Sequence, residues 1–319
     1  MKNMYNLFKR FITIATTEGG KAAFKAFFNL LTAEYYIHKY LLLRRYYKMF
    51  HVDLVRRKIH GNKMCLYVND TGLSRELLLR GTREEVQTRL MKQLVRPGMV
   101  VADIGANIGY YVLIEATIVG ETGKVYAMEP VPQNYELLCK NMRENNYDNI
   151  VETYSCAISD VCGTRKIAVT KQSNLATILT SEDEMSEYAK KALKLGTERT
   201  LDVETITLDK FLEDKGQVDF IRMDVEGHEV EIVRGMLDTL KNSRIGTRLF
   251  IEIHPNLFDK PRAKMEEIMQ NLIRSGFEMK YLADQKSTKL LDFTPDNLLD
   301  IVVSEGSAGI FLEKTHHAV

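Results

Sequence analysis

The chain has 319 residues, enough for one large core with an appendage, and its 45% apolar and 27% charged residues are ordinary for a globular protein. The formal net charge is only +1, which excludes binding of polyanions through overall charge. The charge is unevenly distributed, however, because residues 1–60 hold twelve Lys or Arg and only three acids. A basic N-terminal segment therefore precedes an acidic remainder.

The cysteines and the N-terminus indicate a cytoplasmic location. The four cysteines include no CxxC pair and no histidine at zinc-ligand spacing, so they are expected to be reduced and mostly buried. Residues 1–20 lack the apolar core and the cleavage site of a secretory signal. The most apolar window, residues 22–43, is interrupted by Lys25, Glu34 and Lys39, and it is not expected to span a membrane.

Two regions are predicted in chain order. Residues 1–62 are a basic extension, helical through residue 60, and residues 63–319 form the main domain. In that domain, strands are expected at 63–68, 99–105, 124–130, 151–159, 218–227, 248–254, 277–283 and 309–314, with helices at 74–95, 110–119, 133–146, 228–243 and 261–276. This alternation predicts an α/β fold with a mostly parallel sheet and right-handed crossovers.

Residues 170–200 do not fit the alternation. They are polar and charged, and they lie between two predicted strands. An insertion of this length in an α/β core is typical of a lid or a substrate-binding loop, and a disordered surface loop is the alternative.

The stretch "VVADIGANIGYY", residues 100–111, interrupts a buried apolar strand with small and polar residues. Ligands of open parallel sheets bind beyond the carboxyl ends of the strands. Gly105 and Gly109 lack a β-carbon, so the chain can turn sharply there and a ligand can lie against the backbone. The following helix start offers N–H groups to a polar or anionic ligand.

The next strand ends in Glu129, where a carboxylate is placed to accept hydrogen bonds from both hydroxyls of a ribose. The turn lacks the G-x-G-x-x-G pattern of dinucleotide enzymes and carries Asp103 two residues ahead of the first glycine. This acid would repel a pyrophosphate but can orient an ammonium group. The site therefore favours S-adenosylmethionine over NAD.

A second unusual stretch, "DFIRMDVEGHE", places Asp224 and Glu226 two residues apart at a strand end. One strand later, "IEIHP" places Glu252 and His254 in the same way. Because parallel strands end at the same edge of a sheet, Asp224, Glu226 and His254 are expected to line one cleft over the cofactor. Methyl transfer to a hydroxyl requires in-line alignment and removal of a proton.

His254 is the predicted general base, oriented by Glu226, and Asp224 is assigned to the cofactor side. The alternatives are that the acids complement a helix dipole and that His254 is a satisfied structural residue. Acids and histidine are also the residue types that bind divalent cations, but their spacing does not establish a metal site, and none is predicted.

Several linked motifs resemble the FkbM-type methyltransferases that use S-adenosylmethionine, over residues 70–255. These motifs are "PGMVVADIGANIGYYVL", "VYAMEPVPQNYELL", "CAISD", "TLDKFL", "VDFIRMDVEGHEVEIVRGM" and "FIEIH". The resemblance implies a Rossmann-like class I methyltransferase fold, with a seven-stranded, mostly parallel sheet that closes with an antiparallel strand and helices on both faces. It also implies O-methylation of sugar, glycan or polyketide hydroxyls.

The resemblance also implies roles for particular residues. The expected cofactor-binding residues are Asp103, Gly105, Ala106, Asn107, Gly109, Tyr110, Glu129, Pro130, Cys156, Ala157 and Asp224. Among them, Cys156 and Ala157 would lie beside the adenine. Glu84 resembles the family's upstream glutamate, and His228 stands where alanine is common, so its place in the site is left open.

The predicted function is O-methylation of a hydroxyl on a saccharide, a glycan lipid or a polyketide-like product. The alternatives are N-methylation of a protein or small amine, and a catalytically inactive binding protein. No nucleic-acid partner is expected, because no N-P-P-[YF] motif follows the strand that holds Asp224. Residues 1–60 suit either peripheral contact with an anionic membrane or a helical subdomain or contact in a homo-oligomer.

Overall fold

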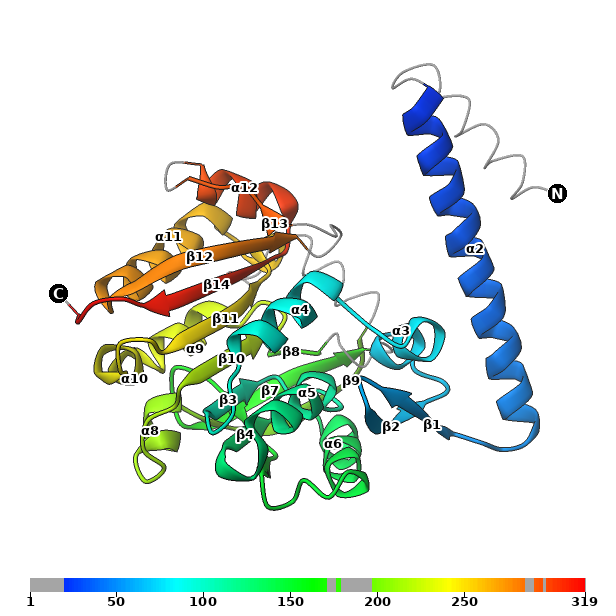
Figure 1. Cartoon of the computed structure of the whole chain (residues 1–319), viewed down its shortest axis with the longest axis horizontal. Helices are drawn as coiled ribbons and strands as arrows, with labels where there is room; N and C mark the ends of the chain where they lie inside the picture. Colours follow the sequence, from blue (N-terminus) through cyan, green and yellow to red (C-terminus); the bar gives the residue numbers. More distant parts are fainter. Residues whose placement is uncertain (1–19, 171–175, 179–196, 285–289, 295–296, 319) are drawn as a thin grey trace.

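The computed structural model describes residues 20–170, 176–178, 197–284, 290–294 and 297–318. Within them, a mixed eight-stranded sheet runs through the centre of the molecule (Figure 1) in the order β13-β12-β14-β11-β10-β3-β4-β5. The strands are β3 (Val100–Ile104), β4 (Lys124–Met128), β5 (Val151–Tyr154), β10 (Phe220–Asp224), β11 (Arg248–Ile253), β12 (Phe277–Asp284), β13 (Leu290–Leu291) and β14 (Ala308–Lys314).

The pairing confirms the predicted sheet. Strands β5, β4, β3, β10 and β11 are parallel to one another, and β14 is antiparallel to both β11 and β12. These are the seven expected strands with one antiparallel closing strand. The two-residue strand β13, which pairs with β12 at the edge of the sheet, was not predicted.

Helices cover both faces of the sheet, and each face has its own apolar core. One face carries α4 (Glu85–Leu94), α5 (Tyr110–Val119) and α6 (Pro132–Glu144), and the other carries α8 (Leu208–Leu212), α9 (Glu229–Arg234), α10 (Leu237–Asn242), α11 (Pro261–Arg274) and α12 (Leu298–Glu305). Helix α5 is mostly apolar around its circumference, apart from Glu115 and Thr117, as expected of a helix that is almost fully enclosed. Short 3₁₀ turns lie at Gly120–Thr122 and Pro255–Leu257.

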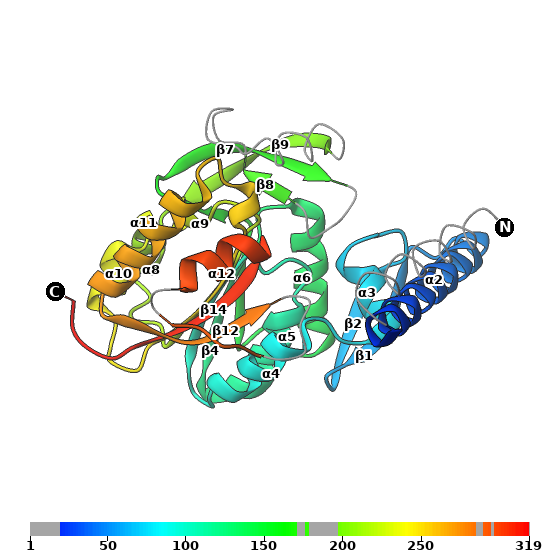
Figure 2. The same cartoon turned by 90° about the horizontal axis from the view of Figure 1, so that it is seen from above.

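A second sheet, which the sequence did not reveal, flanks the central one. It has the order β6-β9-β7-β8, with β6 (Ala157–Ile158), β7 (Gly163–Thr170), β8 (Ala176–Ile178) and β9 (Thr197–Ile206), and Figure 2 shows it along one side of the molecule. The single strand predicted at 151–159 is therefore wrong, because it splits into β5 and β6 on two different sheets. The predicted lid falls mostly on residues 171–175 and 179–196, which lie outside the described residues.

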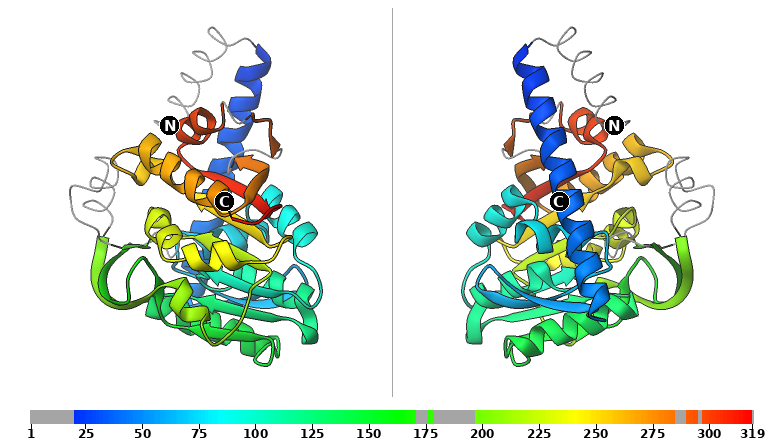
Figure 3. Two further views of the ribbon diagram at one scale, coloured as in Figure 1. Left: turned by 90° about the vertical axis from the view of Figure 1, so that its left-hand side faces the viewer. Right: turned by 90° about the vertical axis from the view of Figure 1, so that its right-hand side faces the viewer.

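The N-terminal region contains α2 (Gly20–Met49), the hairpin strands β1 (Leu54–Ile59) and β2 (Asn62–Tyr67), and α3 (Leu73–Arg80). The prediction of helix through residue 60 is wrong for β1, which pairs antiparallel with the expected strand β2. Helix α2 projects away from the body in Figures 1 and 3 and is attached near its C-terminal end. There the buried Tyr40 hydroxyl lies 2.8 Å from the carbonyl oxygens of Val68 and Asp70.

The helices and the cysteines bear on two further predictions from the sequence. None of the helices among the described residues has both the length and the apolarity needed to cross a membrane. All four cysteines are free, but only Cys65 and Cys156 are buried, whereas Cys162 is exposed.

Candidate functional site

The turn between β3 and α5 is docked onto the end of β4. The backbone N–H groups of Gly105 and Ala106 both donate to the carbonyl oxygen of Met128, at 3.0 Å, and the N–H of Asn107 donates to a carboxylate oxygen of Glu129, at 2.8 Å. Gly105 has φ +81° and Asn107 has φ +51°, left-handed values that glycine and asparagine tolerate best. Hydrogen bonds therefore fix the turn directly to Glu129, the acid predicted to hold the ribose.

The two glycines also make space for the protein itself, a role that the sequence did not reveal. A β-carbon on Gly105 would lie 2.1 Å from the main-chain oxygen of Asp224, so the missing side chain permits close approach of the β3 and β10 ends. A β-carbon on Gly109 would lie 2.8 Å from Leu138 of α6. Gly109 is also absent from the lining of the cavity beside this turn.

This cavity opens at the carboxyl ends of β3, β4 and β10 and is closed on one side by the second sheet. Its described lining includes nine of the expected cofactor residues, namely Gly105, Ala106, Asn107, Tyr110, Glu129, Pro130, Cys156, Ala157 and Asp224. Ile167 of β7, together with Ala176 and Ile178 of β8, supplies an apolar wall. The cavity thus joins an apolar wall to acidic groups at two strand ends, which fits the adenosine and amino acid parts of S-adenosylmethionine.

Glu129 is the acid at the β4 end of the cavity. One carboxylate oxygen accepts from the N–H of Asn107, and the other accepts from the N–H of Val131 at 2.9 Å. Burial raises the pKa of Glu129 to about 7, although these hydrogen bonds partly oppose that effect. Oε1 also accepts from the side-chain amide of Asn134 at 3.4 Å, whereas Oε2 keeps a lone pair with which the ionised group can accept a ribose hydroxyl.

Asp103 is turned away from the cavity, in contrast to the expected contact with a ligand ammonium. Its carboxylate is fully buried and accepts from the guanidinium of Arg222 at 2.9 Å. The second terminal nitrogen of Arg222 donates to Asp224, also at 2.9 Å. Asp103 and Arg222 are register partners on adjacent strands, so their side chains share a face of the sheet.

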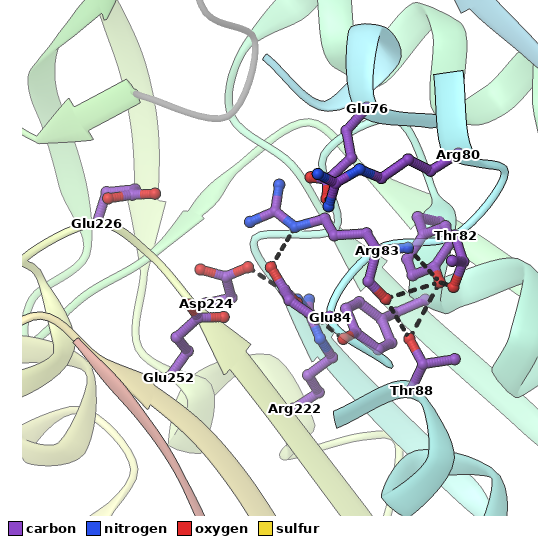
Figure 4. A network of polar contacts seen from close by, with 12 residues as sticks. Glu76, Arg80, Thr82, Arg83, Glu84, Thr88, Arg222, Asp224, Glu226 and Glu252 are labelled. Carbon is purple, nitrogen blue, oxygen red and sulfur yellow. Dashed lines mark hydrogen bonds and ion pairs between the residues drawn. The ribbon is translucent and has the colours of Figure 1, made fainter. Parts of the chain in front are cut away.

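Arg83 and Glu84 lie above this ion pair, on the segment between α3 and α4 (Figure 4). The two side chains form an ion pair with each other, and Glu84 accepts a hydrogen bond from the hydroxyl of Tyr111 at 2.8 Å. The Tyr111 ring covers Arg222, with 4.1 Å between the guanidinium carbon and the ring centroid. Glu84, the upstream glutamate of the resemblance, therefore links Arg83 to this covered cation.

The predicted catalytic residues do converge. Ligand-type atoms of Asp224, Glu226 and His254 all lie within 4.8 Å of one another. Nδ1 of His254 lies 2.7 Å from Glu229, and its Nε2 lies 3.6 Å from Glu226 and 3.8 Å from Glu252. Asp224 and Glu226 line the cavity, whereas His254 lies behind them.

The charges in this cluster do not support His254 as the general base. Burial alone would lower the pKa of His254, but the carboxylates of Glu226, Glu229 and Glu252 raise it well above its usual value. A doubly protonated imidazole has no lone pair to accept a proton. The surrounding acids therefore favour the protonated form of this ring.

Glu226 has the properties expected of a reactive group. It lines the cavity, burial raises its pKa to about 7, and its φ of +34° is strained for a residue with a side chain. Thr177 of β8 holds this turn by donating to the main-chain oxygen of Glu226 at 3.1 Å. Asp224 differs, because Arg222, Arg83 and His254 outweigh its burial and lower its pKa.

His228, whose place was left open, contributes to the cavity lining from the start of α9. Its Nε2 lies 2.9 Å from the hydroxyl of Ser159. Burial lowers the pKa of His228 to about 4, so the ring is neutral near pH 7. It is a hydrogen-bonded wall residue of the cavity.

Sequence analysis missed Arg222, Arg83, Tyr111 and Glu115 as parts of this network. A signal existed for Arg222, since a lone charge within the apolar run "DFIRMD" indicates a buried ion pair. Glu115 similarly interrupts the apolar helix α5, and burial followed by the charge of Asp103 raises the pKa of Glu115 well above its usual value. Arg83 and Tyr111 gave no comparable signal.

Comparison with known proteins places this cavity in a recognised domain. Residues 103–279 match the "Methyltransferase FkbM domain". A protein-L-isoaspartate O-methyltransferase of Methanococcoides burtonii is 32% identical over 79 residues, 24% of this chain and 39% of that protein. The hexuronic acid methyltransferase AglP of Haloferax volcanii is 26% identical over 190 residues, 59% of this chain and 68% of that protein.

The match thus spans less than half of the first relative's length and about two thirds of the second's. Among solved structures, an rRNA methylase from Streptococcus thermophilus is 12% identical with a TM-score of 0.41, over 72% of this chain and 95% of that chain.

Replacement of Gly105 by alanine tests the close approach of β3 and β10. We expect Gly105→Ala to lower the free energy of unfolding by at least about 2 kcal/mol, because the β-carbon meets Asp224 and the left-handed backbone is strained. Gly246→Ala is the control, since φ is +91° there and no atom lies within 4 Å of the added carbon. Equal losses in urea denaturation would show that backbone strain alone explains the effect.

The raised pKa of Glu129 predicts pH-dependent cofactor binding. Ribose hydroxyls donate to the ionised carboxylate, so affinity is complete above the pKa of about 7 and falls below it. We expect S-adenosylhomocysteine to bind about tenfold more weakly at pH 6 than at pH 8 by calorimetry. Glu129→Gln should bind weakly at both pH values, and a wild-type affinity that does not change with pH would contradict the assignment.

Proposed function

Because the chain belongs to the FkbM methyltransferase family, we propose that it transfers a methyl group to an oxygen atom of a small-molecule or glycan acceptor. The cofactor is S-adenosylmethionine. One observation carries the proposal: the matched region, residues 103–279, contains every described lining residue of the cavity except Leu73 and Arg83. The family match and the cavity therefore concern the same part of the molecule.

In this proposal, the cofactor lies along the β3–α5 turn. Backbone of Gly105, Ala106 and Asn107 contacts it, together with Tyr110 and Pro130, and Glu129 accepts the ribose hydroxyls. Cys156 and Ala157 border the adenine against the apolar wall. Asp224 lies toward the methionine end, where its lowered pKa keeps it negative near a cationic ligand. Asp103 acts indirectly, by holding Arg222.

The bound cofactor supplies a methyl group on a sulfonium; its transfer leaves the bonding electron pair on sulfur and sets free the proton of an acceptor hydroxyl. Glu226 contacts that hydroxyl and takes up its proton. Three features support this role: Glu226 borders the cavity, its backbone is strained, and a hydrogen bond from Thr177 fixes its turn. His254 is a positioning residue behind Glu226 instead of the base.

The proposed acceptor group is a neutral hydroxyl, most simply on a saccharide. The name of the relative from Haloferax volcanii concerns a hexuronic acid, a sugar that carries both hydroxyl groups and a carboxylate. Asp224 and Glu226 face the cavity, and the two arginines in its lining are already paired with Glu84, Asp103 and Asp224. The carboxylate of a hexuronic acid would therefore be repelled by these two acids, whereas a sugar hydroxyl can donate a hydrogen bond to Glu226.

A panel of acceptors tests this choice with a methyl-release assay. Hexuronic acids, the matching neutral sugars, polyketide-like alcohols, amines and a structured RNA are compared at one concentration. We expect methyl transfer to the acceptors that carry sugar hydroxyls. The product should survive mild base, because methyl ethers are stable in mild base and methyl esters are not. A base-labile product would assign the carboxylate as acceptor, and activity on amines or RNA alone would overturn O-methylation of sugars.

The role of Glu226 predicts a separation of binding from catalysis. Glu226→Gln should lower kcat by about 100-fold or more, the range for a lost general base, because the amide cannot take up a proton. Its affinity for S-adenosylhomocysteine by calorimetry should stay near that of the wild type. His228→Asn is the comparison, since it changes a neutral group that also borders the cavity. Wild-type turnover of Glu226→Gln would exclude Glu226 as the base.

We also propose that α2 contacts the inner, anionic face of a membrane while the protein remains cytoplasmic. Leu42 is 70% exposed and Met49 is 66% exposed, one heptad apart on α2, near Lys39, Arg45 and Lys48. Exposed apolar residues among basic ones suit the boundary between headgroups and acyl chains. The attachment through Tyr40 leaves these side chains uncovered among the described residues.

Vesicle co-sedimentation tests the contact in the full-length chain, because deleting residues 1–60 would also remove β1. Leu42→Asp with Met49→Asp should reduce pelleting with phosphatidylglycerol vesicles several-fold, since charged groups replace the apolar contact. Ile245→Asp, at a residue 56% exposed elsewhere, is the control. Equal pelleting of the wild type and the double variant would contradict the membrane contact.

A further inference from the structure

The cluster at the ends of β10 and β11 has the geometry of a cation site. Asp224, Glu226 and His254 each present one ligand-type atom, and these atoms lie within 4.8 Å of one another. Ligands of a six-coordinate cation at about 2.1 Å are themselves about 3–4 Å apart. Small side-chain rotations would therefore bring the three atoms onto one ion.

An independent observation comes from Glu252. Its side chain is fully buried beside the cluster, and neither of its oxygens has a hydrogen-bond partner among the described residues. Glu252 is the register partner of Asp224 on the neighbouring strand, and one of its oxygens lies 3.8 Å from Nε2 of His254. Buried polar groups are nearly always satisfied, so this carboxyl group indicates a missing partner.

The orientation of His254 supports the same conclusion. Its Nδ1 is engaged by Glu229 at 2.7 Å, which fixes the ring and directs Nε2 toward Glu226 and Glu252. Histidine ligands of metals typically have their other ring nitrogen bonded to a carboxylate in this way. Glu229 is fully buried, so the arrangement is held firmly.

We propose that Asp224, Glu226 and His254, with Glu252 beside them, bind one divalent cation at the acceptor end of the cavity. Carboxylates with a single imidazole suit Mn²⁺ or Mg²⁺ better than the thiol-preferring metals. The proposal rests on the proposed function and deepens it, because two of the ligands border the cofactor cavity. A cation there would hold the acceptor oxygen and acidify its hydroxyl.

The cation is compatible with the role of Glu226 as base. A carboxylate that ligates through one oxygen keeps the other free to take up the proton of the acceptor hydroxyl. The alternative occupant of the centre is the protonated His254 itself, which neutralises the acids without any ion. The two arrangements differ in whether the full-length protein binds added metal.

Binding of Mn²⁺ to the full-length protein, stripped with EDTA and then desalted, decides between them by electron paramagnetic resonance. We expect one bound Mn²⁺ per chain. Glu252→Gln and His254→Gln should each weaken binding about tenfold or more, as for lost metal contacts. Glu129→Gln is the matched control, a buried acid of the same cavity outside the cluster, and it should bind Mn²⁺ as the wild type does. Thermal unfolding confirms that each variant is folded.

Absence of bound Mn²⁺, or equal binding by the wild type and both cluster variants, overturns the cation site. Methyl transfer that persists in EDTA with no bound Mn²⁺ would overturn the cation while leaving the proposed function intact. The converse result, one bound Mn²⁺ lost in Glu252→Gln but no methyl transfer to any acceptor, would establish the cation and reject the function. The two proposals therefore fail separately.

Discussion

The buried guanidinium of Arg222 is the constraint on which the rest of the site depends. It sits between Asp103 of β3 and Asp224 of β10, 2.9 Å from each, with almost no exposure to water. Such a cation is costly to bury unless its partners are well placed, and removal of one partner would leave an uncompensated charge. Tyr111 covers it from α5, so a helix and two strands are fixed by one side chain.

This ion pair also determines which acids remain available to ligands. Because Asp103 is committed to Arg222, the cavity keeps Glu129 at the end of β4 and Asp224 with Glu226 at the end of β10. The arginines hold the pKa of Asp224 low, whereas burial raises that of Glu226. Neighbouring carboxyl groups thereby acquire different pKa values, which is the pattern expected of a site that uses acids in different roles.

Sequence reasoning succeeded where a single strand or helix carries its own pattern. The apolar runs of β3, β4 and β10 and the helix α5 lie where expected, and the shared edge of the parallel strands brings Asp224, Glu226 and His254 together, although Glu226 and His254 lie just beyond the strand ends. It failed where the position of a side chain depends on the pairing between two separate segments of the chain. The face of the sheet that Asp103 shares with Arg222 follows from the register between β3 and β10, and strand parity within β3 does not reveal that register.

The second sheet escaped prediction for a related reason. The N-terminal halves of strands β7 and β9 are largely exposed to solvent. Their sequences there are polar and lack the long apolar runs of the central strands. The raised pKa of His254 was equally hidden, because it comes from Glu226, Glu229 and Glu252, acids on two separate segments of the chain. Contacts between distant segments of the chain therefore determine both the second sheet and the pKa of His254.

The strained turn at Glu226 joins these features. A φ of +34° at a partly exposed glutamate is maintained only if the surroundings fix it, and three elements do so here. Strand β10 anchors the turn through the Arg222 ion pair, Gly105 directly after β3 packs against the main chain of Asp224, and Thr177 of the second sheet holds the carbonyl of Glu226. The second sheet therefore helps to fix the turn that places Glu226 at the cavity, so replacement of Thr177 should alter the position of this carboxylate.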